Sequence, residues 1–244
     1  GLTDPPTRRP AAPLVPPERH AFPEAVYEAC RSGDQLDAVY ACERLIDDET
    51  AVVLEADRGR GKSSAAGFAA AALAARGSKV VVTAPSYRNA AELFERAAEV
   101  LRTLDALTDD GRDGQTKPFL RTPTGEIRFR TPVEAAEDSP DVLFVDEAAA
   151  LPVRQLEALS AAVPSVCFAT TVRGYEGAGR GFAVRFRDEL ETSRAVVDCV
   201  LAEPIRYAAA DPIEVWVFHA LLLDSTPPAN QLVEGSIPED ASYE

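Results

Sequence analysis

A glycine- and arginine-rich segment at residues 57–64 carries the residue types that bind phosphate. It reads DRGRGKSS, follows the apolar run 51–56, and leads directly into the alanine-rich segment 64–76. A buried strand, a loop ending in Gly-Lys-Ser and a helix are the context of a P-loop. Small residues let successive backbone N–H groups surround phosphate oxygens, and the helix N-terminus adds partial positive charge. We expect Lys62 to reach the β- and γ-phosphates and the Ser63 hydroxyl to bind Mg²⁺.

A second segment, DVLFVDE at 141–147, supplies carboxylates for the same site. Its apolar residues predict a buried strand, with Asp146 holding the Mg²⁺ shell and Glu147 polarising the attacking water. Alone this motif is weak, because strands that leave a core commonly end in an acid. Together with the P-loop it predicts a hydrolytic, RecA-like P-loop ATPase rather than a nucleotide kinase or a GTPase.

Residues 165–187 add hydroxyl and guanidinium groups. The expected strand ends at Thr171, where a RecA-like sheet places a sensor strand between the other two, although β-branched residues also simply suit strand ends. Four glycines at 174–181 surround Arg180. This pattern has two interpretations: a flexible loop that brings the Arg180 guanidinium to phosphate or RNA, or a flexible surface loop with no such role. Arg206 is another phosphate candidate and fits a structural salt bridge equally well.

Composition limits the class of protein. The 244 residues are 46% hydrophobic and can bury one substantial α/β core. No apolar run has the length of a membrane span, so we expect a cytoplasmic protein with no membrane partner. The chain has 40 acidic and 25 basic residues, and few of the basic residues are lysine. This composition is typical of proteins from a high-salt cytoplasm, such as that of a haloarchaeon. High salt weakens counterion release, so the net charge of −15 weighs little against an RNA partner.

Strands and helices are expected to alternate, which predicts a mostly parallel sheet with helices on both faces. We expect an ATPase domain at 24–223 with a surface insertion at 103–131, flanked by a Pro-rich linker at 1–23 and a second linker at 224–244. Because the chain has no Met, we expect it to be part of a longer protein. The expected strands are 51–56, 79–84, 142–146, 165–171 and 195–201, with a hairpin at 119–130. The expected helices are 24–31, 35–48, 63–76, 87–102, 152–161, 182–191 and 211–223.

Four motifs occur together in this chain: RGRGKS (58–63), VDEAAALP (145–152), TTVRGYEGAGRGF (170–182) and EPIRYAAADPIEVWV (203–217). Together they resemble the RecD-like helicase module of the tRNA(Met) cytidine acetyltransferases, over about residues 24 to 224. The resemblance implies a parent enzyme that makes N4-acetylcytidine in RNA with acetyl-CoA and ATP. It implies tRNA and a GNAT acetyltransferase domain of the same parent chain as partners. We find no acetyltransferase segment here, so this chain is not expected to bind acetyl-CoA.

The resemblance also implies roles for single residues. It implies that Gln35 contacts the edge of the adenine base, whereas without the resemblance Gln35 would be read as a solvated residue at a helix N-terminus. It also implies that Arg180 contacts ATP. It adds ATP contacts from the whole loop: Ala56, Asp57, Arg58, Gly59, Arg60, Gly61, Lys62, Ser63 and Ser64. The expected function is ATP-driven remodelling of the tRNA anticodon stem, presenting the wobble cytidine of elongator tRNA(Met).

Two alternatives remain open at the level of sequence. One is a fragment of a superfamily-1 DNA helicase, and the other is a binding module that uses ATP only as a conformational ligand. Glu147 argues against the second alternative. The sequence also leaves open which of Arg180 and Arg206 acts as the arginine finger.

Overall fold

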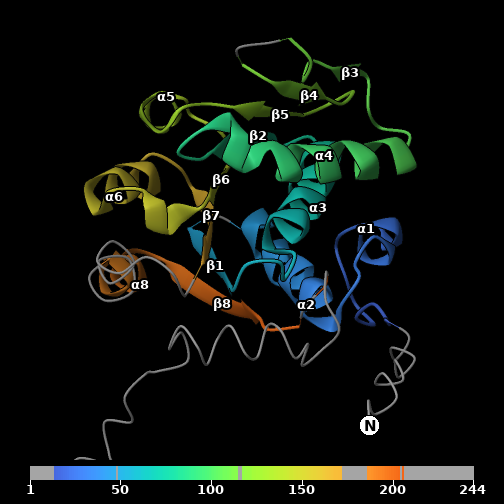
Figure 1. The fold of residues 1–244 in the computed structure, drawn as a ribbon, viewed down its shortest axis with the longest axis horizontal. Coiled ribbons are helices and arrows are strands. Elements are labelled where there is room, and N and C mark those ends of the chain that lie inside the picture. The colour runs from blue at the N-terminus through green and yellow to red at the C-terminus, as the bar shows by residue number, and fades with distance from the viewer. Residues whose placement is uncertain (1–13, 48, 115–116, 172–185, 204, 206–244) are drawn as a thin grey trace, which may run out of the picture. The chain divides into compact units, whose positions relative to one another are not determined.

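Eight strands of the described residues form one sheet (Figure 1). The computed structural model describes residues 14–47, 49–114, 117–171, 186–203 and 205, all within the compact unit Gly1–Ala209. The strands are β1 (Thr50–Ala56), β2 (Lys79–Thr83), β3 (Asp109–Asp110), β4 (Phe119–Arg121), β5 (Glu126–Phe129), β6 (Val142–Asp146), β7 (Ser165–Thr171) and β8 (Ala195–Leu201). Their order across the sheet is β3-β4-β5-β2-β6-β7-β1-β8.

The central part of the sheet is parallel. β1 pairs in parallel with both β7 and β8, β6 pairs in parallel with β2 and β7, and only β3–β4 and β4–β5 are antiparallel. β7 therefore lies between the strand that enters the glycine loop and the strand that ends in Asp146, as expected for the sensor strand. Because parallel strands end at the same edge, this order brings the loop, Asp146 and Thr171 together.

Helices cover both faces of the sheet, as predicted. The helices α1 to α4 surround one core cluster, and α5, α6 and α8 surround the other, so they appear on opposite sides of the strands in Figure 1. The helices are α1 (Glu24–Glu28), α2 (Gly33–Cys42), α3 (Lys62–Ala75), α4 (Tyr87–Thr103), α5 (Pro132–Glu137), α6 (Val153–Ala161) and α8 (Arg187–Ser193), with 3₁₀ turns η1 (Glu43–Ile46) and η2 (Ala148–Ala150).

The alternation of side chains along β1 shows how one strand serves both cores. Val52 and Leu54 belong to the cluster under α1 to α4, whereas Ala51 and Val53 belong to the cluster under α5, α6 and α8. All four are essentially fully buried. A strand buried on both faces reads as a continuous apolar run, which is why β1 was recognisable in the sequence.

The segment 103–131, expected as a surface insertion, contributes three strands to the sheet. The hairpin predicted at 119–130 is confirmed, because β4 and β5 pair in antiparallel register. β5 also pairs in parallel with β2, with Val80 opposite Ile127, so the segment extends the sheet. Helix α5 follows it and was not expected, although Thr131 and Glu134 form a capping box that the sequence carries.

Other helices differ from expectation mainly at their ends. The helix expected at 35–48 gives way to the 3₁₀ turn η1 after Cys42, and α8 begins at Arg187, after residues that are not described. The helix expected at 211–223 lies outside the described residues. Among the described residues, no helix is long and apolar enough to span a membrane.

Candidate functional site

The loop between β1 and α3 has the backbone of a phosphate-binding turn. Gly59 and Gly61 have φ values of 80° and 82°, in the left-handed region that glycine adopts without cost. A Cβ on Gly61 would lie 2.2 Å from Ile205 Cδ1 and 2.3 Å from Gln35 Nε2. Helix α3 begins at Lys62, so its first backbone N–H groups and the positive end of its dipole point toward this loop. The start of α3 is thus suited to bind an anion.

Lys62 links the loop to the two acids at the end of β6. Its Nζ lies 2.9 Å from Asp146 Oδ1 and 3.7 Å from Glu147 Oε1. The Lys62 side chain is 7% exposed and that of Asp146 is 0% exposed, whereas Glu147 is about a quarter exposed. Two carboxylates therefore share one buried ammonium as their counter-ion.

Glu147 is held in an unusual position. Its backbone has φ 52° and ψ 44°, a left-handed conformation that is strained for a residue with a side chain. The Glu147 N–H donates to Asp146 Oδ1 at 2.9 Å, and Thr171 Oγ1 donates to Glu147 Oε2 at 3.3 Å. Thr171, predicted from sequence as a sensor, thus directly contacts the carboxylate predicted to activate water.

Gln35 connects the start of α2 to the loop. It is 1% exposed, its Oε1 accepts from the Arg31 N–H at 2.8 Å, and its Nε2 donates to Gly61 O at 3.0 Å. A primary amide has two donor hydrogens and two acceptor lone pairs, and these two contacts with described residues use one of each. The adenine-reading role of Gln35 stays a prediction, and the structure adds a role in holding the loop.

The residues present fit a magnesium ion. Asp146 Oδ2 is buried and has no hydrogen-bond partner within the described part of the chain, and Ser63 lies in the first turn of the adjacent helix. Mg²⁺ prefers one or two protein oxygens, with water and phosphate oxygens completing its shell. Among the described residues, no group of three or more His, Cys, Asp or Glu could hold a metal without such help.

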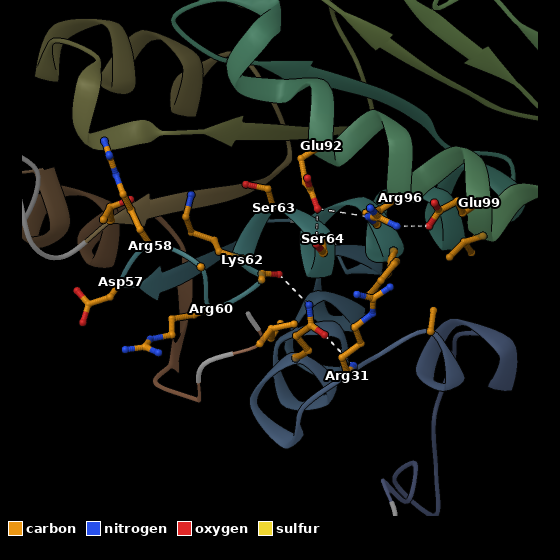
Figure 2. A pocket seen from close by; sticks show the side chains of 18 of the residues that line it. Arg31, Asp57, Arg58, Arg60, Lys62, Ser63, Ser64, Glu92, Arg96 and Glu99 are labelled. Atoms are coloured by element: carbon orange, nitrogen blue, oxygen red, sulfur yellow. Dashed lines mark hydrogen bonds and ion pairs between the residues drawn. The ribbon is translucent and has the colours of Figure 1, made fainter. Parts of the chain in front are cut away.

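A cavity of about 560 Å³ surrounds these groups (Figure 2). Loop residues 57–64, Gln35, Glu147 and Thr171 line it, while Ala56 and Asp146 are buried beneath its surface. The structure therefore brings most of the predicted residues to one place. Arg180 and Arg206 lie outside the described residues.

Sequence reasoning missed one wall of the cavity, which is formed by α4. Ser64 Oγ donates to Glu92 Oε1 at 3.1 Å, and Arg96 bonds both Glu92 and Glu99, at 3.3 and 2.6 Å. Burial acts to lower the pKa of Arg96, but the hydrogen bonds to Glu99 and Glu92 outweigh it and raise that pKa. The spacing of these charges along a helix is visible in the sequence, but their position beside the loop depends on tertiary packing.

Comparison with known families gives a match over most of the chain. Residues 53–224 match the family described as RNA cytidine acetyltransferase NAT10/TcmA, helicase domain. The tRNA(Met) cytidine acetyltransferase TmcA of Haloarcula marismortui is 54% identical, covering 100% of this chain and 32% of that protein. The same-named protein of Haloferax volcanii is also 54% identical, covering 96% and 31%. The chain thus spans about a third of the length of these relatives.

Solved structures with a similar fold include bacteriophage large terminases. The large terminase of a thermophilic bacteriophage has a TM-score of 0.56 at 12% identity, covering 76% of this chain and 49% of that chain. A mutant of the ATPase domain of a Thermus phage large terminase has a TM-score of 0.51 at 19% identity, covering 80% and 91%. These likenesses confirm the predicted RecA-like P-loop fold.

Proposed function

The chain belongs to the RNA cytidine acetyltransferase NAT10/TcmA helicase-domain family, and on this premise we propose that it is a Mg²⁺-dependent ATPase module. Its ATP hydrolysis remodels the anticodon stem of elongator tRNA(Met), so that an acetyltransferase domain of the same parent chain can acetylate the wobble cytidine. The observation that carries the ATPase role is Lys62, which bridges Asp146 and Glu147 at the start of α3.

The charges of the site support separate roles for the lysine, the Mg²⁺ ligands and the glutamate. Triphosphate oxygens would compete with the two acids for Lys62, because they bring more negative charge to the same ammonium. Ser63 and the unpartnered Oδ2 of Asp146 would hold Mg²⁺, which when bound neutralises charge on the β- and γ-phosphates. Once Lys62 has moved away, Glu147 becomes a stronger acceptor and orients the attacking water, while Thr171 fixes the direction of its carboxylate.

The remaining nucleotide contacts come from the predicted residues. The loop from Ala56 to Ser64 surrounds the phosphates, and Gln35 contributes its remaining amide donor and acceptor to adenine. We assign Arg180 and Arg206, from sequence alone, to the γ-phosphate or to RNA. A related fold supports the choice of ligand, because the bacteriophage terminase has been solved in complex with ADP and with ATP-gamma-S.

The RNA partner is supported by the relatives' name, tRNA(Met) cytidine acetyltransferase. Those relatives are about three times as long as this chain, so the proposed acetyltransferase domain, and the binding of acetyl-CoA, belong to other parts of the parent protein. The proposed location is the cytoplasm, where tRNA is modified. The acidic surface suits a high-salt cytoplasm.

The test is ATP hydrolysis by this chain in high-salt buffer with Mg²⁺, with and without tRNA(Met). We expect Glu147→Gln to bind ATP but to hydrolyse it at least 100-fold more slowly, because the base is lost while the Mg²⁺ ligands remain. Glu157→Gln, a carboxylate on α6 outside the cavity, is the matched control and should retain full turnover. Equal turnover by Glu147→Gln and the parent would remove Glu147 from the mechanism. Stimulation by single-stranded DNA but not by tRNA would contradict the proposed substrate.

A further inference from the structure

The chain that follows β8 lies against the phosphate loop. β8 is parallel to β1 and the last residues of the two strands are paired, so the chain leaves both strands at the same level (Figure 1). We call the described residues that come next, Ala202, Glu203 and Ile205, the post-β8 segment. The Ile205 N–H donates to Gly59 O at 3.3 Å, and a Cβ on Gly61 would lie 2.2 Å from Ile205 Cδ1. The segment thus contacts both left-handed glycines of the loop.

Asp34, in the first turn of α2, holds the start of this segment. Its Oδ2 accepts from the N–H groups of Ala202 and Glu203 at 2.7 and 2.6 Å, across 168 and 169 positions of sequence. These N–H groups come directly after the last residue of β8, where the pairing with β1 stops, so the carboxylate replaces a strand as their acceptor. An acid in the first turn of a helix is favourable in any case, because of the helix dipole. That preference does not explain two hydrogen bonds to one distant segment.

Helix α2 binds the loop as well as the post-β8 segment. Gln35, the neighbour of Asp34, donates from Nε2 to Gly61 O at 3.0 Å. The loop is therefore held at two carbonyl groups, that of Gly61 by α2 and that of Gly59 by Ile205. Asp34 joins these two supports to each other. Because the contacts form a closed set, release of the segment from Asp34 also weakens the support at Gly59.

The Asp34 contacts can open without unfolding of the core. Asp34 is partly exposed, and Ala202 and Glu203 are exposed. Hydrogen bonds at the surface open at a lower free energy than those between buried strands. A charged acceptor nevertheless makes these bonds stronger than a neutral one would. The post-β8 segment is thus suited to two states, one bound to Asp34 and one released from it.

We propose that Asp34 is a positioning residue that couples the phosphate loop to the post-β8 segment, so that this segment regulates the affinity for nucleotide. While the segment is bound to Asp34, Gly59 and Gly61 keep the conformation that surrounds phosphate, and release of the segment lowers the affinity. By linkage, nucleotide binding strengthens the contact of the segment with Asp34 by the same factor. Asp34 does not line the cavity, so its effect on the nucleotide is indirect. This regulation rests on the proposed function, because it requires a triphosphate at Lys62.

The first experiment is a double-mutant cycle of Asp34→Ala and Ile205→Ala, with the affinity for ATP measured by calorimetry in high-salt buffer with Mg²⁺. Each single variant should lose roughly fivefold or more in affinity. Because both substitutions break the same connection, the double variant should bind within about twofold of the weaker single variant, whereas independent losses would multiply. Asp37→Ala, at an exposed position of α2, and Val200→Ala, at a position of β8 that is 60% exposed, are the matched controls. Both controls should bind ATP as the parent does.

The second experiment measures amide hydrogen exchange of Ala202 and Glu203 in the unsubstituted chain by NMR, with and without saturating MgATP. Reciprocal coupling predicts that ATP slows the exchange of both amides by roughly the factor lost in Asp34→Ala, about fivefold or more. This measurement needs no variant, so it does not depend on whether Asp34→Ala folds.

The outcomes separate this regulation from the proposed function. Losses that multiply in the cycle would mean that Asp34 and Ile205 act independently, and unchanged ATP affinity in Asp34→Ala would mean that the loop does not depend on Asp34. Exchange of the two amides that ATP leaves unchanged would mean that the segment does not sense the nucleotide. Each of these three results overturns the proposed coupling and leaves the phosphate site intact. A parent that binds no ATP contradicts the proposed function, and the coupling with it.

Discussion

Removing Lys62 should destabilise the protein even in the absence of nucleotide. In the structure its ammonium is the counter-charge for two acids, one of which, Asp146, is completely buried. Lys62→Met leaves Asp146 buried without its cation. Replacing one partner of a buried ion pair is expensive because the desolvation of the remaining charge is no longer compensated.

The size of the effect follows from the two distances. At an effective dielectric constant of about 20, charges separated by 2.9 Å attract by about 6 kcal/mol and charges separated by 3.7 Å by about 4.5 kcal/mol. Desolvation of the lysine offsets most of this attraction, and Glu147 is partly hydrated. We therefore expect Lys62→Met to cost about 3 kcal/mol, at the lower end of the roughly 3–5 kcal/mol for breaking buried pairs.

The assay is urea unfolding followed by circular dichroism, without nucleotide, for a double-mutant cycle of Lys62→Met and Asp146→Asn. Because the double variant has neither charge of the pair, it should lose about 2 kcal/mol less than the sum of the single variants. Lys79→Ala, an exposed lysine at the start of β2, should stay within about 0.5 kcal/mol of the parent. MgATP at about 100 times its Kd should stabilise the parent by about 2.7 kcal/mol and leave Lys62→Met unchanged.

Two results would refute this reasoning. Additive single costs, within about 0.5 kcal/mol, would mean that Lys62 and Asp146 are not coupled in the folded protein. Stabilisation of Lys62→Met by MgATP to the same extent as the parent would remove Lys62 from the phosphate site.

Three other predictions concern the remaining groups. Thr171→Val should slow ATP hydrolysis more than it weakens ATP binding, because the hydroxyl that orients the neighbouring glutamate is lost, and Thr171→Ser should restore turnover; a Val variant with full turnover would contradict this. Arg180→Ala should lose roughly 10³-fold in hydrolysis with near-normal binding, and Arg206→Ala should lose less; the reverse order in a single-turnover assay would give the finger role to Arg206. Burial raises the pKa of Cys30 and of Cys199 to about 12, so a thiol reagent at pH 8 should label neither until urea is added, and rapid labelling of the folded protein would be the contrary result.

The grouping of these residues at one place could be predicted because they lie at the ends of recognisable strands. The apolar runs before Asp57 and before Asp146 identify two strands. Knowing that a third strand ends at Thr171 was sufficient to expect all three ends at one edge. The contact between Thr171 and Glu147 is the structural result of that order.

The α4 wall of the cavity could not be predicted in the same way. It depends on how α4 packs against α3, and that packing depends on Gly67, whose role is visible only when the Leu93 carbonyl is in place. The pairing of β5 with β2 is also a long-range contact, and the composition of a short strand such as β5 does not predict it. Helix α5 was missed for a different reason, because the capping box of Thr131 and Glu134 is visible in the sequence and was not used.

The strained backbone of Glu147 and the charge of Lys62 both act on the same group, the Glu147 carboxylate. A left-handed conformation at a residue with a side chain costs about 1–3 kcal/mol and persists only where its surroundings impose it. Here the Asp146 carboxylate binds the Glu147 N–H, and Thr171 and Lys62 bind its carboxylate. Of these three partners only Lys62 is expected to change partner when a triphosphate arrives. The backbone and Thr171 would then keep Glu147 in position after its contact with Lys62 is lost, so that nucleotide binding itself would free the Glu147 carboxylate to act as a base.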